Sequence, residues 1–240
     1  MNETKPKVVI IGASFIGMEA AAMMSKLAES VTVVALESVP LERVLGPEVG
    51  RVFQRLHEKN GICFHLNATV KEFLPKKDKY GHFGAVELHD GQIIHGDIVI
   101  LGVGIKLVTD FAREAGLPTL PDGGISVDAN LQVVGHSNIY AAGDIATFPC
   151  QYSCESKVRI EHWDVALQQG RIAGYNMAAN SVDEMKPYNS VPFFFTNQYG
   201  KSLRYTGSAH GGYDSVHIDG DLEAEQLNFA AYYISTILYY

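Results

Sequence analysis

Residues 7 to 19 read Lys-Val-Val-Ile-Ile-Gly-Ala-Ser-Phe-Ile-Gly-Met-Glu, an apolar strand that passes through a glycine turn into a helix. Gly12 allows a sharp turn, Ser14 stands where this fingerprint usually has its second glycine, and Gly17 permits close packing of helix on strand. A strand, tight turn and helix in this order form the first part of a βαβ unit, and the N–H groups that open such a helix attract phosphate. The sequence therefore predicts a dinucleotide site whose contacts are Gly12, Ser14, Phe15, Ile16 and Gly17.

The strand expected over Val31 to Leu36 ends at a carboxylate. Glu37 follows Gly17 by twenty residues, the spacing at which an acidic side chain reaches the ribose 2′-hydroxyl. A carboxylate there repels a 2′-phosphate, and no Lys or Arg follows before Arg43, so the sequence favours NAD over NADP. A plain βαβ unit with Glu37 as a solvated strand end is the alternative that remains open.

Composition excludes several classes of protein. The net charge of −8 argues against a nucleic-acid partner, because phosphate backbones are bound by basic surfaces. Three cysteines in 240 residues do not form a disulfide framework, so we expect an intracellular setting, mitochondrion or cytoplasm. Neither a targeting signal nor a run of membrane-spanning length is present in the sequence, and no membrane span is expected.

The remainder of the first half alternates between helical and strand patterns. Apolar residues with helical spacing run from Pro47 to Asn60, and Ile62 to Leu66 follows as a strand. Three short strands are then expected over 69–74, 84–89 and 92–95, the last two joined by a turn at Asp90-Gly91. A buried strand over 98–101 ends at Gly102-Val103-Gly104. The pattern predicts an α/β fold, a parallel nucleotide-binding sheet with an antiparallel β-meander before its closing strand.

From about Leu120 the pattern changes. A turn at 122–124 precedes an expected strand pair, and a helix is expected from Glu161-His162-Trp163 to Ala178. Past Pro192 the sequence is rich in strands, which we expect over 193–196, 202–206, 214–218 and 227–233.

Four motifs in this order resemble one family. They are the glycine turn with Glu19, Gly102-Val103-Gly104, the stretch from Ile139 to Asp144, and the stretch from Glu161 to Arg171. In these segments the chain is similar to FAD-dependent pyridine nucleotide-disulfide oxidoreductases of the ferredoxin reductase and apoptosis-inducing factor branch. Residues 191–193, 200–205 and 220–223 look most like the apoptosis-inducing factor 3 group, whose members can carry a Rieske domain.

The resemblance implies an enzyme that transfers a hydride from NADH to FAD and then passes electrons to an iron-sulfur protein or Rieske domain. It implies FAD contacts at Gly143, Asp144, Glu161, His162 and Trp163, with Asp144 on the ribityl chain. The last three open a helix whose dipole would stabilise negative charge at the flavin N1/C2 edge. It also implies that Glu19 lies near the nicotinamide and that Gly102 and Gly104 allow a close approach to NAD.

The resemblance further implies three parts. They are an NAD-binding Rossmann-like domain over 1–119, the C-terminal half of an FAD-binding domain over 120–188, and a truncated C-terminal domain over 189–240. The family holds FAD with a second glycine cradle, whereas this sequence has one, so we expect an incomplete portion of the oxidoreductase. A non-catalytic isoform that binds NAD or a protein partner is the alternative, and the family pattern also allows a homodimer.

Cysteine and metal chemistry are not expected. Cys63-Phe64-His65 has half of a Rieske motif, but no Cys-x-x-His follows, so we expect Cys63 to pack in the core. Cys150 and Cys154 lie four apart in a loop without an evident redox partner. A short-chain dehydrogenase would need a Tyr with Lys four residues later, and none of the 12 Tyr has one.

Overall fold

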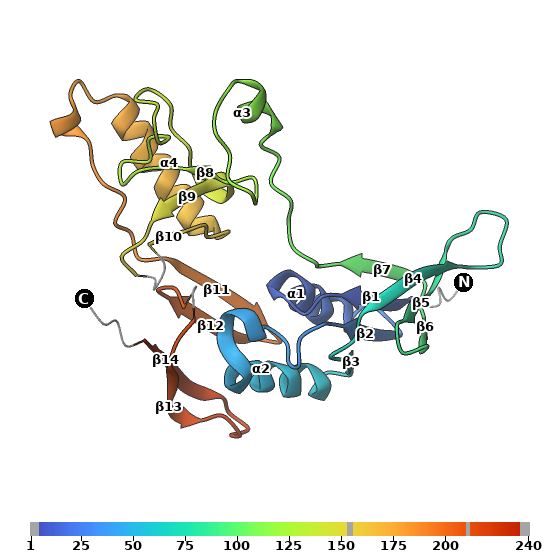
Figure 1. The fold of residues 1–240 in the computed structure, drawn as a ribbon. Helices are drawn as coiled ribbons and strands as arrows, with labels where there is room; N and C mark the ends of the chain where they lie inside the picture. Colours follow the sequence, from blue (N-terminus) through green and yellow to red (C-terminus); the bar gives the residue numbers. More distant parts are fainter. Residues whose placement is uncertain (1–4, 153–155, 210–211, 236–240) are drawn as a thin grey trace. The chain divides into compact units, whose positions relative to one another are not determined.

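A computed structural model describes residues 5–152, 156–209 and 212–235 (Figure 1). By their contacts these residues fall into two units. Unit 1 takes in the described residues of Met1–Gly104, Thr196–Ser202 and Ile218–Ala231. Unit 2 takes in those of Ile105–Phe195, Leu203–His217 and Tyr232–Tyr240. The expected division of the chain into three parts stays a prediction.

Unit 1 is built on a four-stranded parallel sheet of order β3-β2-β1-β7. Its strands are Lys7–Ile11 (β1), Ser30–Val34 (β2), Ile62–His65 (β3) and Ile98–Leu101 (β7). Buried β-branched residues fill β1 and β2, as expected for strands covered on both faces. Because β2 and β7 lie on opposite sides of β1, the carboxyl ends of β1 and β7 form a switch point. Open α/β sheets bind ligands at such a point.

Two helices connect the first three strands. Helix α1, Phe15–Met24, packs against β1 and β2 and buries Met18 and Ala21. Helix α2, Glu42–Lys59, contacts β3 and is interrupted at Gly46, after which Pro47 opens its second segment. Both predicted helices are confirmed: α1 follows the glycine turn and begins at Phe15, and α2 begins at Glu42 instead of Pro47.

The predicted antiparallel meander is confirmed as a three-stranded sheet. Its strands are Val70–Pro75 (β4), Phe83–Leu88 (β5) and Ile93–His95 (β6). Val86 and Leu88 form a buried cluster with Val9 and Val34 of the parallel sheet. The meander thus shares a core with the sheet that carries the glycine turn.

The prediction that Cys63 packs in the core is wrong. Cys63 lies in β3, at the edge of the parallel sheet, and its side chain is exposed. Side chains alternate along a strand, so the burial of Ile62 places Cys63 on the opposite face. The continuous apolar run in the sequence concealed this alternation.

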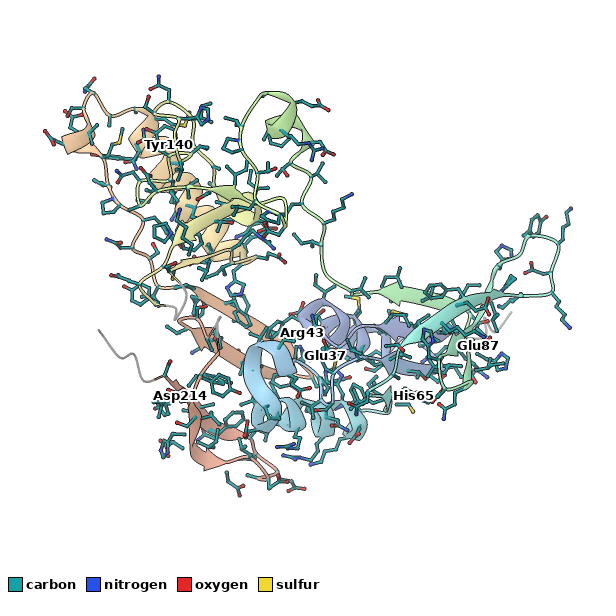
Figure 2. The ribbon with its side chains drawn as sticks, viewed as in Figure 1. Glu37, Arg43, His65, Glu87, Tyr140 and Asp214 are labelled. Carbon is teal, nitrogen blue, oxygen red and sulfur yellow. The ribbon has the colours of Figure 1, made fainter. Side chains whose placement is uncertain are left out.

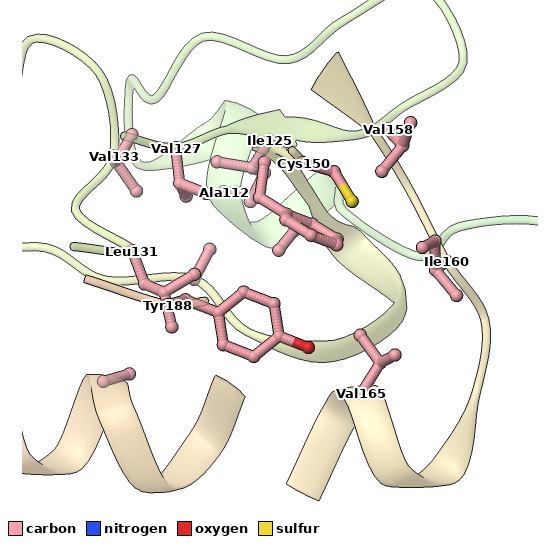
Figure 3. Close-up of a cluster of buried hydrophobic side chains, with 14 residues drawn as sticks. Ala112, Ile125, Val127, Leu131, Val133, Cys150, Val158, Ile160, Val165 and Tyr188 are labelled. Carbon is pink, nitrogen blue, oxygen red and sulfur yellow. The ribbon is translucent and has the colours of Figure 1, made fainter. Parts of the chain in front are cut away.

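Unit 2 is centred on helix α4, Trp163–Met177, which confirms the predicted helix. A small sheet combines Ile125–Ser126 (β8), Ala146–Pro149 (β9) and Lys157–Val158 (β10). Short helices lie at Asp110–Glu114 (α3), Gly143–Ile145 (η1) and Val182–Glu184 (η2). Figure 3 shows the core of this unit, where Val165 of α4 and the Tyr188 ring lie among Val127, Leu131 and Val158.

The strands predicted past Pro192 are also present. Phe193–Gln198 (β11) pairs with Lys201–Thr206 (β12), and Ser215–Asp221 (β13) pairs with Asn228–Ile234 (β14). Tyr199 and Gly200 have φ of +53° and +74° and form the two-residue turn between β11 and β12. Among the described residues, we find no helix with the length and hydrophobicity that a membrane crossing requires.

Candidate functional site

Glycines make the turn at the switch point very narrow. Gly12 follows β1 with φ +101°, and a Cβ there would lie 2.3 Å from the carbonyl oxygen of Gly102. A Cβ on Gly17 would lie 2.1 Å from the carbonyl oxygen of Gly12. Neither position has room for a side chain, so α1 begins directly against the ends of β1 and β7.

Ser14 replaces the second fingerprint glycine without disturbing this turn. Its hydroxyl donates to the carbonyl oxygen of Gly102 over 3.0 Å, which ties the start of α1 to the end of β7. Ser14 is the N-cap residue, and its side chain makes no capping hydrogen bond to α1. The first N–H groups of an α-helix lack partners within the helix and favour an anion.

A cavity of about 490 Å³ lies over the turn, within the size range of small-ligand sites. Six predicted nucleotide contacts line it: Gly12, Ser14, Phe15, Glu37, Gly102 and Gly104. Ile16 and Gly17 are not among its lining residues, and the Ile16 side chain is exposed. The closely packed glycine backbone, the N-terminus of α1 and the Glu37 carboxylate together fit a dinucleotide.

Glu37 does not face the cavity alone. Its carboxylate accepts a hydrogen bond from Arg43 Nε over 2.7 Å, and both side chains line the cavity (Figure 2). Next to them, the Glu42 carboxylate accepts from the Ser38 N–H over 2.8 Å, which lowers the pKa of Glu42. Sequence reasoning missed the pairing of Arg43 with Glu37. The cavity therefore offers a ribose-hydroxyl acceptor with a guanidinium beside it.

Glu19 lies outside the lining of this cavity. It follows Phe15 by four residues and thus occupies the same face of α1, one turn further on. Its Oε1 accepts a 2.5 Å hydrogen bond from the hydroxyl of Thr196, at the end of β11 that belongs to unit 1.

Two buried polar residues of unit 1 escaped sequence reasoning. His57 Nε2 lies 2.6 Å from Gln198 Oε1, and both side chains are buried. Burial lowers the pKa of His57 to about 4, so its ring is neutral at pH 7. A signal was present for His57, because it lies one turn after Phe53 on the buried face of the predicted helix.

The predicted flavin contacts lie together in unit 2, around the start of α4. His162 is the N-cap of α4, and its side chain makes no capping bond to the helix. Gly143 and Asp144 lie in η1, which packs against α4. Trp163 is 87% exposed, which excludes a core role for its ring. Asp144 and Glu161 are also exposed.

Arg159 and Gln169 extend this group beyond the predicted residues. Arg159 pairs with Asp122 over 3.1 Å and with Glu161, and it donates to the Asp144 carbonyl oxygen over 3.4 Å. Gln169 Oε1 accepts a 2.8 Å hydrogen bond from the Gly143 N–H. Gln169 lies within the motif from Glu161 to Arg171, so the sequence motif did include this residue.

Two polar atoms at this place are buried without a hydrogen-bond partner among the described residues, His162 Nδ1 and Gln169 Nε2. Burial lowers the pKa of His162, against the opposing charges of Asp144 and Glu161. Buried polar atoms normally have partners, so these two favour a polar ligand beside η1 and the first two turns of α4. A flavin, with its ring nitrogens and carbonyl groups, fits that requirement.

Cys150 does not have the environment of a reactive thiol. Burial raises the pKa of the Cys150 thiol, the opposite of what a reactive thiolate requires. Cys154 lies outside the described residues. No cluster of three or more His, Cys, Asp or Glu that could hold a metal ion occurs in residues 5–152, 156–209 and 212–235.

Known proteins are similar in sequence to nearly the whole of this chain. Apoptosis-inducing factor 3 of Mus musculus is 38% identical over 225 residues, which cover 94% of this chain and 35% of that protein. Rhodocoxin reductase of Rhodococcus erythropolis is 33% identical, with 90% of this chain and 48% of that protein covered. The chain thus spans about a third to a half of the length of these relatives.

Solved structures agree with the fold described above. A ferredoxin reductase from Rhodopseudomonas palustris matches with a TM-score of 0.84 and 31% identity, over 96% of this chain and 54% of that one. Putidaredoxin reductase, in its covalent complex with putidaredoxin, matches with a TM-score of 0.85 and 30% identity, over 97% and 53%. These matches confirm the predicted α/β fold class. Residues 1–170 match the family model for pyridine nucleotide-disulphide oxidoreductases, and this chain therefore belongs to that family.

Proposed function

We propose that this chain binds NADH and presents it to FAD in a flavin-dependent NADH oxidoreductase. The observation that carries the proposal is the glycine turn at the switch point, with its cavity and with Glu37 at the end of β2. The name of one relative, the ferredoxin--NAD(+) reductase component of an anthranilate 1,2-dioxygenase system, points to the same chemistry.

In this proposal the nucleotide is held mainly by backbone groups. The first N–H groups of α1 donate to the diphosphate, which Gly12 allows to approach closely. Glu37 accepts from the adenosine ribose hydroxyl, while its bond to Arg43 fixes the orientation of the carboxylate. Gly102 and Gly104 leave the far side of the cavity open for the nicotinamide half.

Gly143, Asp144, Glu161, His162 and Trp163 are the residues that we propose for the flavin. FAD, when bound there, supplies the N5 atom that accepts a hydride and passes the electrons on. Asp144 accepts from the hydroxyl groups of the ribityl chain. The N-terminus of α4 stabilises negative charge by roughly 0.3–1 kcal/mol, and by more where water is excluded.

We further propose an iron-sulfur protein or a Rieske domain as the electron acceptor, since several relatives and neighbours are named as ferredoxin reductases. The chain covers about half of these proteins, so we propose that it contributes only part of the complete FAD site. A homodimer is also compatible with this role.

A second function is NAD binding without electron transfer, which the single glycine cradle in the sequence favours. Purification of the full chain separates the two. Yellow protein that NADH bleaches supports the oxidoreductase, and colourless protein that binds NAD supports the second function. A chain that binds neither NAD nor ADP-ribose in titration calorimetry would overturn both.

A further inference from the structure

We propose that Thr196, Gln198 and His57 are positioning residues that hold the Glu19 carboxylate for the carboxamide group of the nicotinamide ring. This inference rests on the proposed function. Five side chains of unit 1, from α1, α2, β11 and the β11–β12 turn, form a hydrogen-bonded row: Tyr199, His57, Gln198, Thr196 and Glu19.

Four contacts connect this row. The Tyr199 hydroxyl lies 3.2 Å from His57 Nδ1, and His57 Nε2 lies 2.6 Å from Gln198 Oε1. Gln198 Nε2 donates to Thr196 Oγ1 over 3.1 Å, and Thr196 Oγ1 lies 2.5 Å from Glu19 Oε1. These hydrogen bonds therefore run without a break from buried side chains to an exposed carboxylate on α1.

The chemistry of the groups fixes the direction of every bond. Because the Gln198 amide nitrogen donates to Thr196, the amide oxygen faces His57, and His57 Nε2 must carry the proton. His57 Nδ1 is then an acceptor and takes the hydroxyl proton of Tyr199. Thr196 already accepts from Gln198, so its own proton goes to Glu19. All four donors therefore point toward the carboxylate.

Burial makes this arrangement hard to rearrange. The side chains of His57, Gln198 and Thr196 are 0%, 1% and 2% exposed. A buried donor or acceptor that loses its partner is strongly disfavoured, so the members stabilise one another's orientation. The last bond, to a carboxylate, is the strongest kind. Glu19, an exposed side chain on α1, is thereby held in one orientation.

The Glu19 carboxylate has a second oxygen that can accept a hydrogen bond from a ligand. Oε1 accepts from Thr196, and Oε2 has no hydrogen-bond partner among the described residues. Glu19 lies on the α1 face of Phe15, which lines the nucleotide cavity. The nicotinamide carboxamide carries two N–H donors, and a fixed acceptor oxygen is the group that recognises them.

The test compares NAD⁺ with ADP-ribose, which lacks the nicotinamide ring but retains the rest of the nucleotide. Thr196→Val removes the hydroxyl at nearly constant shape, and Thr196→Ser retains it as the matched control. In titration calorimetry of the full chain, we expect Thr196→Val to weaken NAD⁺ binding about tenfold and leave ADP-ribose binding unchanged. Thr196→Ser should bind both ligands as the parent chain does.

Other outcomes overturn the inference. An equal loss for both ligands in Thr196→Val, or no loss, would show that the row has a structural role only. If the parent chain binds ADP-ribose but binds NAD⁺ no more tightly, this inference fails while the proposed nucleotide site stands. If the parent binds neither, both fail.

A measurement on the parent chain keeps the test valid should Thr196→Val fail to fold. ¹⁵N NMR distinguishes the two neutral forms of a histidine ring. We expect His57 to carry its proton on Nε2 at pH 7. A proton on Nδ1 would contradict the direction of the row and overturn the inference.

Discussion

At the scale of single residues, Gly17 decides whether α1 can start where it does. The sequence indicated that Gly17 permits close packing of helix on strand, and the structure agrees, because a Cβ at Gly17 would collide with the Gly12 carbonyl oxygen. We predict that Gly17→Val lowers the free energy of unfolding by about 1–3 kcal/mol through overpacking. Urea denaturation measures this change.

The matched control is Gly174→Ala. Gly174 lies in α4, and a Cβ there would meet no atom within 4 Å. Alanine favours a helix more than glycine does, so this variant should equal or exceed the parent in stability. Equal stability of Gly17→Val and the parent would contradict the packing at the glycine turn.

Arg43 changes what the sequence predicted for nucleotide preference. The sequence favoured NAD because the Glu37 carboxylate repels a 2′-phosphate and no Lys or Arg follows before Arg43. Since Arg43 already bonds to Glu37, we predict that Glu37→Ala alone frees the guanidinium for a 2′-phosphate. The ratio of NAD to NADP dissociation constants should shift toward NADP by about tenfold or more, a free-energy change of about 1.4 kcal/mol.

The double variant Glu37→Ala with Arg43→Gln provides the control for this prediction. It removes the carboxylate and the guanidinium together, so most of the gain for NADP should disappear. If the two variants show the same ratio, Arg43 does not bind the 2′-phosphate.

At the scale of elements, His57 links α2 to the turn of β11 and β12 and gives this link a pH dependence. Its pKa is about 4 in the folded chain, against 6.5 for the ordinary side chain. Between these values the unfolded chain binds a proton that the folded chain does not. The contribution of the neutral His57 to the free energy of unfolding is therefore present in full well above pH 6.5. It is lost as the pH falls toward 4, by about 3 kcal/mol in total.

Urea denaturation between pH 4.5 and 7.5 tests this dependence. His57→Gln can still donate to Gln198 but has no group that titrates in this range. We expect a smaller loss of stability toward pH 4.5 in this variant than in the parent. His162 remains in both proteins, so it cannot account for a difference. Identical slopes would show that His57 does not titrate with a lowered pKa.

Gln169 also links two elements, η1 and α4, through a buried hydrogen bond. Its Oε1 accepts from the Gly143 N–H, and the side chain is fully buried. We predict that Gln169→Leu destabilises the chain by about 1–3 kcal/mol, because it leaves a buried N–H without a partner. Gln168→Leu, at the neighbouring half-buried position, should change stability by less. Thermal unfolding compares them, and equal effects would contradict this role for Gln169.

The elements that sequence reasoning predicted are those with a local periodic pattern. Alternation and helical spacing are contained within 69–95 and within α2 and α4, so these could be predicted. The pairing of β8 with β9 joins segments about twenty residues apart, and no local pattern reports it. Helix α3 has five residues, too few for a period to show.

The same distinction, between local patterns and contacts made only in the fold, separates the site residues that could be predicted from those that could not. Gly12, Gly17 and Glu37 belong to one fingerprint of fixed spacing and could be predicted. Arg43 lies close to Glu37 in sequence, but their ion pair depends on how the start of α2 folds. Thr196 and Gln198 meet Glu19 and His57 across more than 140 residues, which requires the three-dimensional structure.

At the scale of the whole molecule, the proposed function gives the two units separate tasks. Unit 1 carries the glycine turn and the nucleotide cavity, and unit 2 carries the residues proposed for the flavin. Because the nucleotide cavity is formed entirely within unit 1, we predict that NAD binding does not require flavin. We expect NAD⁺ to bind whether or not the purified chain contains FAD.

Titration calorimetry of the full chain with NAD⁺ tests this account most directly, with Gly17→Val and Gly174→Ala measured beside it. We predict one-to-one binding to the parent and to Gly174→Ala, and binding at least tenfold weaker, or lost, in Gly17→Val. A parent chain that does not bind NAD⁺, or a Gly17→Val variant that binds it as tightly as the parent, would contradict the account.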